Sequence, residues 1–505
     1  MKKIKGIFYI WCAVFGLVMA ACVDDDSFTT STSHVLSFST DTLSLDTTFS
    51  NVPTPTKTMW VYNRSGKGIR CQNVRLEGGN QNGFRVNVDG SYLGQTAGFQ
   101  THDVEIRKGD SIRVFVELTS KMQHSNEPNL VEDNLIFQLE SGVQQKVNLH
   151  AYSWDALLWK DGKKVAKGET EEIANEGKPI VVYGGIKVDS TATLTIKPGV
   201  KLYFHENAGL DVYGTLHIEG EKGNEVLLRG DRIDNMFDYL PYDRTPGQWQ
   251  GLRLRSSSVG NKIQFADIHS TYNGILVDSC HDESIAKQSK LELLQSTIHN
   301  CQGYGVKVDS AAIVTIENCL ISNTLNHCLY VYGGSVSMNY TTLAQFYPFD
   351  YRRASAIGFK APVHQLDVSN SLVTGYADDE VVWTPVDEEP LHANFSYSVL
   401  RTVQLSDKDK EKFPDIVFGD SILYEEGDSI ERDEKYIYFG KQHFSKFDTD
   451  NFVYDFHLCG NSAAVGWANP KASAQDRDGN ERDSEKPDAG CYQRQEKKED
   501  KESGK

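Results

Sequence analysis

Three consecutive acidic residues form the sequence's clearest candidate for acid–base chemistry: Asp378, Asp379 and Glu380. Two carboxyl groups about 5 to 10 Å apart across a groove can share the roles of general acid and general base. The cluster follows Gly375 in a polar stretch between strand-like pieces of chain. A run of charge in a loop is more often simply solvated. The sequence therefore leaves two interpretations open, a catalytic pair and a solvated loop.

A second polar group lies near the C-terminus and resembles half of a calcium-binding loop. Its members are Asp476, Asp478, Asn480 and Asp483. Gly479 and Asn480 stand in the wrong order for an EF-hand, and Pro487 occupies the position where that loop needs a glutamate. We therefore expect a structural turn, with calcium as the alternative and no other cofactor. The histidines show no HExxH spacing, so the sequence predicts no zinc site.

The N-terminus predicts export. Lys2, Lys3 and Lys5 precede an apolar run from Ile7 to Met19, which two alanines follow. This layout is typical of a secretory signal peptide, here residues 1–21. The apolar run is shorter than the roughly 20 residues that a membrane span needs.

The next residue, Cys22, completes a window that resembles a bacterial lipobox. That resemblance implies acyl chains, such as palmitate, on Cys22 and an anchor in the outer membrane. Asp24, Asp25 and Asp26 resemble a signal that sends some lipoproteins to the cell surface, although they also suit a solvated tether. We expect residues 22–33 to form a flexible, lipidated tether. The formal net charge of −18 argues against binding nucleic acid or anionic headgroups.

Residues 34–153 alternate apolar and polar side chains in many short runs separated by turn residues. This pattern predicts a β-sandwich. The runs WVYNRSG, VRLEG and IRKGDSIRVFV, in this order, resemble the immunoglobulin-like domains that precede other modules in surface proteins. The resemblance implies a spacer or adhesion domain. Residues 154–177 are expected to connect it to the next domain.

A different pattern begins at Lys178, where TLTIKPGV is followed by LDVYGTLHIEG. These motifs resemble the opening coils of right-handed parallel β-helix proteins of the pectate-lyase-like type. A repeat supports the same fold, because Ile298, Ile321 and Leu343 occupy the same position in three similar units, which follow one another after 23 and then 22 residues. Three short strands per coil fit this period, and each coil must stack on its neighbours to bury its apolar face.

The repeat also predicts a register. The unit around Ile268 lies 30 to 31 residues before its partner, because a polar insertion at 281–289 must bulge from a turn. Cys301 should stack on Thr324, and no disulfide should form among Cys301, Cys319 and Cys328.

The all-β fold predicted from these patterns is an immunoglobulin-like sandwich followed by a β-helix over 178–492, with long loops after 345. The end of the β-helix carries DRDGNER and DAGCY, which resemble the terminal motif of bacterial β-helix proteins. The charged tail 493–505 should be disordered.

Taken together, these features favour a cell-surface lipoprotein whose β-helix is a non-enzymatic binding or structural module facing glycans. Several aromatic residues could stack on sugar rings or equally fill the core: Trp249, Tyr272, Tyr304, Tyr330, Tyr332, Phe346 and Tyr347. The alternative is a polysaccharide lyase or glycoside hydrolase. The pectate-lyase-like resemblance implies related hydrolases with Asn-Thr-Asp and Gly-His-Gly motifs, which this sequence lacks. Fold alone does not decide between the two.

The lipid anchor is directly testable. We expect Cys22→Ala to release the protein from the membrane fraction, because the lipobox resemblance places the acyl chains on this residue. Fractionation and immunoblotting of cells expressing the two forms measure this. A variant that stays in the membrane fraction would contradict lipidation at Cys22.

Overall fold

The computed structural model describes most of the 505-residue chain, namely residues 27–79, 81–360, 363–384, 391–402, 413–418, 440, 443–470 and 475–495. The chain divides into two compact units, 1–155 and 156–505. The lipidation candidate Cys22 and the acidic residues Asp24, Asp25 and Asp26 lie outside the described residues. Among the residues described, no helix is long and apolar enough to cross a membrane.

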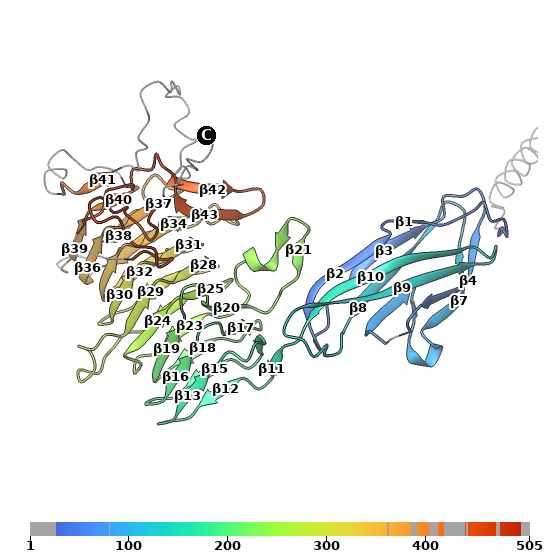
Figure 1. Cartoon of the computed structure of the whole chain (residues 1–505), viewed down its shortest axis with the longest axis horizontal. Coiled ribbons are helices and arrows are strands. Elements are labelled where there is room, and N and C mark those ends of the chain that lie inside the picture. Colours follow the sequence, from blue (N-terminus) through green and yellow to red (C-terminus); the bar gives the residue numbers. More distant parts are fainter. Residues whose placement is uncertain are drawn as a thin grey trace, which may run out of the picture. The chain divides into compact units, whose positions relative to one another are not determined.

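The first unit consists of two five-stranded sheets around one apolar core (Figure 1). One sheet has the order β1 (Ser37–Phe38), β3 (Lys57–Tyr62), β8 (Ser111–Leu118), β5 (Phe84–Val88) and β6 (Ser91–Tyr92). The other has the order β2 (Thr42–Phe49), β10 (Gln144–Trp154), β9 (Asn129–Leu139), β4 (Ile69–Leu76) and β7 (Gln100–Ile106). Alternate residues of β5 and β8 are buried between the sheets, which is the burial pattern of a β-sandwich.

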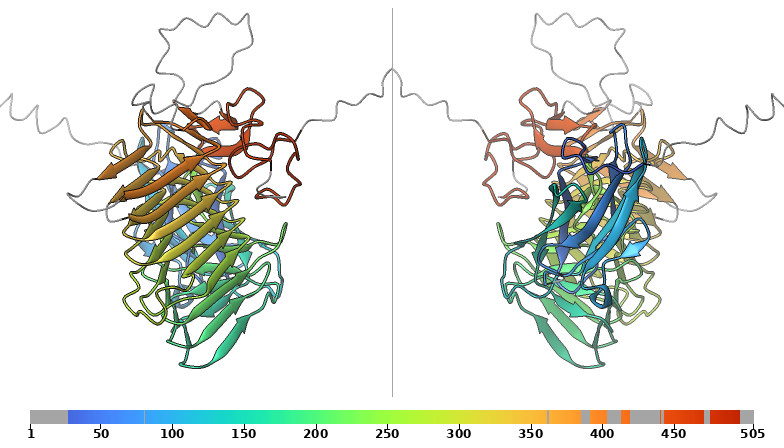
Figure 2. Two further views of the ribbon diagram at one scale, coloured as in Figure 1. Left: turned by 90° about the vertical axis from the view of Figure 1, so that its left-hand side faces the viewer. Right: turned by 90° about the vertical axis from the view of Figure 1, so that its right-hand side faces the viewer.

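The second unit is a stack of coils, each with three short strands, so that three parallel sheets run along it (Figure 2). We name the sheets A, B and C in the order in which a coil passes through them. Sheet A contains β11 (Leu157–Trp159), β14 (Ile180–Val182), β17 (Lys201–Phe204), β20 (Val226–Gly230), β25 (Ala266–His269), β28 (Thr297–Cys301), β31 (Leu320–Thr324), β34 (Thr342–Gln345), β37 (Leu372–Gly375), β40 (Ser398–Leu400) and β41 (Ile416–Phe418).

The other two sheets contain nine strands each. Sheet B contains β12 (Lys163–Val165), β15 (Ile186–Val188), β18 (Leu210–Val212), β23 (Leu252–Leu254), β26 (Ile275–Val277), β29 (Val306–Val308), β32 (Leu329–Tyr332), β35 (Ile357–Lys360) and β38 (Val381–Thr384). Sheet C contains β13 (Thr170–Ile173), β16 (Thr193–Ile196), β19 (Thr215–Glu219), β24 (Asn261–Gln264), β27 (Leu291–Leu294), β30 (Ile313–Glu317), β33 (Ser335–Asn339), β36 (Val363–Ser369) and β39 (Leu391–Ser396).

This arrangement is a parallel β-helix, as the sequence predicted. Successive inward-facing residues of sheet A pair in register and are fully buried: Leu202, Leu228, Ile268, Ile298, Ile321 and Leu343. Cys301 pairs with Thr324, which confirms the predicted register. The seven cysteines within the described residues are all free. The segment 154–177, which we expected to be a connector, carries β11, β12 and β13 and forms the first coil.

The bend from sheet C into sheet A needs one residue in the left-handed conformation. In six coils this residue is not glycine, and its φ lies between 44° and 54°: Phe265, Gln295, Asn318, Tyr340, Asn370 and Tyr397. Left-handed backbone is uncommon for such residues and costs about 1–2 kcal/mol. The bend sets the orientation of the following strand about its own axis, and so decides which side chains of sheet A face outward. In β25 these are Asp267 and His269.

A C-terminal segment covers much of the outward face of sheet A. It contains the antiparallel pair β42 (Phe444–Asp448) and β43 (Val453–Leu458). Phe444 and Phe456 pack against Phe346 of the coils in one buried cluster. Arg482, in the terminal motif, stacks on Tyr340 at 3.8 Å and donates a 2.8 Å hydrogen bond to Asn318 Oδ1. The motif therefore docks the segment on the coils.

Two carboxylates hold one imidazole in this segment. His457 Nε2 lies 2.9 Å from Asp478, and Nδ1 lies 2.6 Å from Asp455. The hydrogen bond to Asp478, followed by that to Asp455, raises the pKa of His457 to about 9. The stability that the charged His457 gains from its two carboxylate partners is fully present below the ordinary histidine pKa, about 6.5. It is lost as pH rises through 9.

We therefore expect the amide protection factors of β43, corrected for intrinsic exchange rates, to fall between pH 6.5 and 9.5. Hydrogen exchange followed by mass spectrometry measures them. His457→Gln cannot carry the charge, and its protection should be lower at pH 6.5 and change little across this range. An equal fall in both proteins would rule out His457 as the titrating group.

Candidate functional site

The side chains of the three predicted acidic residues do not converge on one site in the structure. Asp378 is 94% exposed and lies 3.6 Å from the Arg401 guanidinium. Asp379 accepts a 2.6 Å hydrogen bond from Thr402 Oγ1. Glu380 is fully buried and accepts hydrogen bonds of 2.7 Å from the backbone N–H groups of Ala356 and Ala377. Burial raises the pKa of Glu380 to about 8. These contacts tie a loop to the preceding coil.

The candidate calcium residues form a closed turn. Asp476 is buried and accepts hydrogen bonds from the backbone N–H groups of Asp478, Asn480 and Gln493, at 3.0, 2.7 and 3.0 Å. Asp483 accepts two further backbone N–H groups, those of Glu485 and Lys486. A cation would have to displace these donors. The turn instead orders the segment that docks through Arg482.

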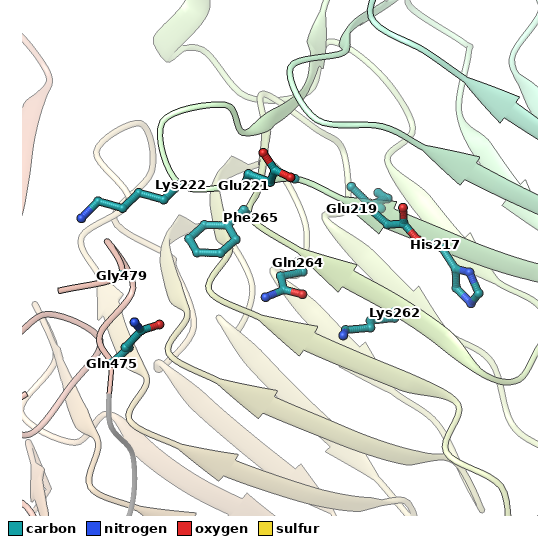
Figure 3. Close-up of a pocket in the computed structure, with 11 residues that line it drawn as sticks. His217, Glu219, Glu221, Lys222, Lys262, Gln264, Phe265, Gln475 and Gly479 are labelled. Carbon is teal, nitrogen blue, oxygen red and sulfur yellow. The ribbon is translucent and has the colours of Figure 1, made fainter. Parts of the chain in front are cut away.

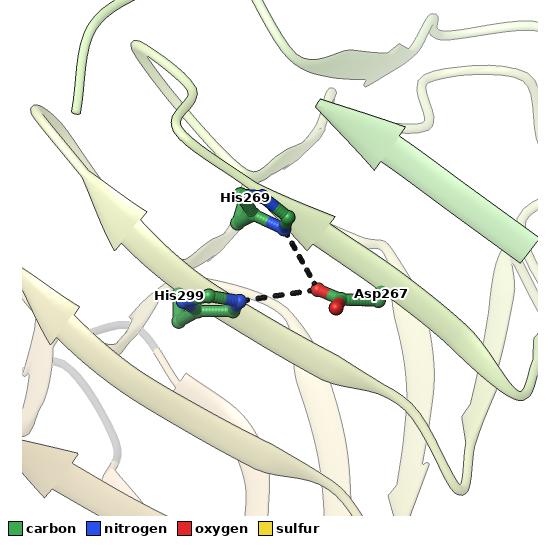
Figure 4. Close-up of side chains that lie close together, drawn as sticks. All are labelled: Asp267, His269 and His299. Carbon is green, nitrogen blue, oxygen red and sulfur yellow. Dashed lines mark hydrogen bonds and ion pairs between the residues drawn. The ribbon is translucent and has the colours of Figure 1, made fainter. Parts of the chain in front are cut away.

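A different cluster lies on the outward face of sheet A, across β25 and β28. One carboxylate oxygen, Asp267 Oδ1, lies 3.0 Å from His269 Nδ1 and 3.1 Å from His299 Nε2 (Figure 4). The two imidazole rings stack with their centroids 4.5 Å apart. Their strands are neighbours and His269 pairs with His299, so the rings sit one above the other at the strand spacing.

A second carboxylate reaches the cluster from outside the coils. The insertion between β20 and β23 carries the hairpin β21 (Asn235–Phe237) and β22 (Leu240–Pro241), followed by a 3₁₀ turn, Tyr242–Arg244. Asp243 of this turn lies 3.2 Å from His269 Nε2 and forms an ion pair with Arg229 of β20. His269 is thus held between two carboxylates, one on each ring nitrogen.

The electrostatics of the cluster follow from these contacts. Burial alone would raise the pKa of Asp267, but the charges of His269 and His299 outweigh it and hold that pKa well below the usual value. The pKa of Asp243 is also lowered, because the hydrogen bond and charge of His269 outweigh burial. Burial lowers the pKa of His269, yet Asp267 and Asp243 raise it overall. Asp243, Asp267 and His269 therefore stabilise one another's charged forms.

The cluster borders a cavity of about 240 Å³ between sheet A and the C-terminal segment. Its lining includes Asp243, His299, Ser322, Phe452 and Tyr454. The Asp243 side chain is 51% exposed and that of His299 is 26% exposed, whereas His269 is only 5% exposed. Asp243 and His299 are thus the members that a molecule in the cavity would touch.

This cluster was not predicted from the sequence, although part of it is visible there. The 30-residue offset that aligns Ile268 with Ile298 also aligns His269 with His299. A search for histidines separated by one coil would have found the pair, whereas HExxH spacing suits a helix. Asp243 lies in an irregular insertion, and no pattern in the sequence predicts where its side chain points.

A larger hollow of about 650 Å³ lies on the outward face of sheet C (Figure 3). Its lining includes His217, Glu219, Lys222 and Lys262. Glu219 is paired with Lys197 at 2.8 Å, and Lys222 lies 3.3 Å from Asn480. Glu219 and Lys222 are thus directed to separate neighbours, so this hollow resembles a binding surface more than a reaction centre.

The aromatic residues singled out in the sequence mostly have structural roles. Trp249 is buried and stacks on Phe204 at 4.3 Å, and Phe346 lies in the core beneath the C-terminal segment. Tyr347 is also buried. Tyr304 and Tyr330 pack against each other with their rings tilted by 36°. Tyr272 and Tyr332 are exposed.

Comparison with known proteins supports the fold of the second unit. Residues 180–343 match a family model described as a right handed beta helix region. With the three parallel sheets, this identifies the second unit as a right-handed parallel β-helix. No curated protein matches the chain.

Similar solved structures include the catalytic unit of a thermostable GH87 α-1,3-glucanase from Streptomyces thermodiastaticus. It shares 10% identity over 68% of this chain and 73% of that chain, with a TM-score of 0.24. The Agl-KA catalytic domain shares 13% identity over 74% and 71%, with a TM-score of 0.26. A family 123 glycoside hydrolase from Clostridium perfringens shares 7% identity over 27% of this chain and 30% of that chain, with a TM-score of 0.18.

The prediction of a non-enzymatic binding or structural module is not upheld. Glycoside hydrolases recur among the similar structures, although at these identities and TM-scores the likeness carries no argument about activity. The structure also contains a cluster of carboxylates and imidazoles that was not predicted from the sequence.

The contacts of Glu380 predict that it stabilises the fold. We expect Glu380→Ala to lower the free energy of unfolding by about 2–4 kcal/mol, because the buried N–H group of Ala356 and the part-buried N–H group of Ala377 lose their acceptor. Urea unfolding of the purified chain measures this. Asp378→Ala removes a solvated neighbour and should change the free energy of unfolding by less than about 0.5 kcal/mol. Equal effects of the two substitutions would contradict the assignment.

Proposed function

We propose that the β-helix is a glycoside hydrolase that cleaves a neutral polysaccharide at the cavity beside sheet A. The observation that carries this proposal is that Asp243 and His299 line the cavity and also belong to the charged cluster around Asp267. Concave sites where perturbed titratable groups converge are the usual location of catalysis.

Two carboxyl groups are available for acid–base work. Hydrolysis needs one group that protonates the leaving oxygen and one that activates water. Asp243 and Asp267 bond to opposite nitrogens of His269, so the imidazole fills the space between them and they do not flank one glycosidic bond directly. We assign the general base to Asp243, which its lowered pKa keeps ionised and which borders the cavity. Asp267 acts through His299, whose ring lines the cavity.

The surroundings of the cavity favour a neutral sugar chain. Phe452 and Tyr454 line it, and Phe237 and Tyr239 form an exposed stacked pair on the hairpin that leads to Asp243. Aromatic faces of this kind pack against apolar faces of ligands. The chain's net charge of −18 disfavours a polyanionic uronan. The cavity of about 240 Å³ is below the range of about 300–1,000 Å³ for drug-sized ligands and suits a single sugar ring of a longer chain.

The rest of the chain supports a position outside the cell. We propose that Cys22 carries the lipid anchor in the outer membrane and that Asp24, Asp25 and Asp26 direct the protein to the cell surface. The two-sheet unit that follows is proposed to be an immunoglobulin-like spacer between the tether and the β-helix. This order would present the cavity to extracellular glycans.

A panel of neutral glucans and pectins, assayed for reducing ends and for unsaturated products, tests the activity. We expect reducing ends from a neutral glucan. Asp243→Asn should lower kcat/KM by about 10²–10⁴-fold, the usual contribution of an acid–base group.

Asp378→Asn is the matched control, because it removes an exposed carboxylate outside the cavity lining and should leave the rate unchanged. Unsaturated products from pectin would identify a lyase instead. An Asp243→Asn variant with the full rate would contradict the proposed site.

A further inference from the structure

We propose that Asp267, His269 and His299 form a binding site for a divalent transition metal of the zinc type. Their ligand atoms, one carboxylate oxygen and two imidazole nitrogens, lie within 4.8 Å of one another. Among the described residues, these three are the histidines, cysteines and acids whose ligand atoms lie close enough together to hold a metal ion. Binding is inferred from geometry alone, whereas a catalytic role for the metal rests on the proposed function.

The distances within the group suit a small tetrahedral ion. Zinc binds imidazole nitrogen and carboxylate oxygen at about 2.0–2.2 Å, so neighbouring tetrahedral ligands lie about 3.3–3.5 Å apart. Asp267 Oδ1 lies 3.0 Å from His269 Nδ1 and 3.1 Å from His299 Nε2. Small shifts of the side chains would admit the ion. Two nitrogens and one oxygen exclude the all-oxygen environment that calcium and magnesium prefer.

Asp243 completes the arrangement found around metal-bound histidines. A histidine that binds a metal usually donates its other ring N–H to a carboxylate, which fixes the tautomer and orients the ring. His269 offers Nδ1 to the proposed metal, and its Nε2 lies 3.2 Å from Asp243 Oδ1. Asp243 is therefore also a positioning residue for the metal site, held in turn by Arg229.

The three protein ligands would leave one ligand position unfilled. Structural zinc sites have four protein ligands, whereas catalytic zinc sites have three and leave one position for water or substrate. The proposed site therefore has the ligand count of a catalytic site, and His299 places it at the edge of the cavity.

Metal binding to the full chain, purified without an affinity tag that binds metals, tests the proposal. After treatment with a chelator, we expect one equivalent of Zn²⁺ by isothermal titration calorimetry, and Co²⁺ should give the visible spectrum of a tetrahedral site. His299→Ala and Asp267→Asn should each weaken Zn²⁺ binding at least 100-fold. Asp243→Asn should weaken it by about 10–100-fold, the usual effect of losing an outer carboxylate.

His457→Gln is the matched control, because His457 also lies between two carboxylates but is not part of the proposed site. This variant should bind one equivalent with unchanged affinity. Circular dichroism of each variant establishes that it is folded, and His299→Gln replaces His299→Ala if the alanine variant unfolds. No stoichiometric binding, or binding that survives both His299 and Asp267 substitutions, would overturn the site.

The outcomes separate the two proposals. Zinc binding without glycan cleavage would leave the metal site standing and remove the hydrolase. Cleavage at the full rate by protein that contains no metal, with no zinc binding, would leave the hydrolase standing and remove the metal site.

Discussion

Hydrogen bonds between successive coils are the interaction on which the rest of this structure depends. Each strand of a coil pairs in parallel with the strands before and after it, so a coil satisfies its backbone only through its neighbours. The same pairing fixes the side-chain columns, such as that from Leu202 to Leu343 in the core. It also fixes which outward-facing side chains lie over one another in successive coils. His269 lies over His299 because Ile268 lies over Ile298.

Much of the β-helix could be predicted because stacking leaves a period in the sequence. The spacing of Ile298, Ile321 and Leu343 gave the register, and the pairing of Cys301 with Thr324 confirmed it. The first coil was missed because two of its three strands, Lys163–Val165 and Thr170–Ile173, are short and rich in charge. The site was missed for a different reason. Its residues are joined by pairing across one coil and by an insertion, and neither the carboxylates around Asp378 nor the turn at Asp476 belongs to it.

The site occupies a part of sheet A that the C-terminal segment leaves open. Over Ala344 and Phe346 that segment closes the outward face with apolar side chains, so no chemistry is accessible there. Farther along the sheet, polar residues replace apolar ones at His299 and Ser322, and the segment bridges a cavity instead of filling it. The terminal motif, through Arg482, therefore serves the site indirectly, because it holds the wall that contains Phe452 and Tyr454.

The bends of the coil differ in length. From Phe265 onward, the bend from sheet C into sheet A is built around a left-handed residue, such as Phe265 or Asn318, whereas the three earlier bends run over 174–179, 197–200 and 220–225. The turns from A to B and from B to C already hold long insertions, at 231–251 and 281–289, without disturbing the pairing on either side. The loop that carries Asp243 can therefore be replaced during evolution while the strand pairing on either side stays the same. A lineage of such proteins could acquire new substrates at that position while inheriting the same scaffold.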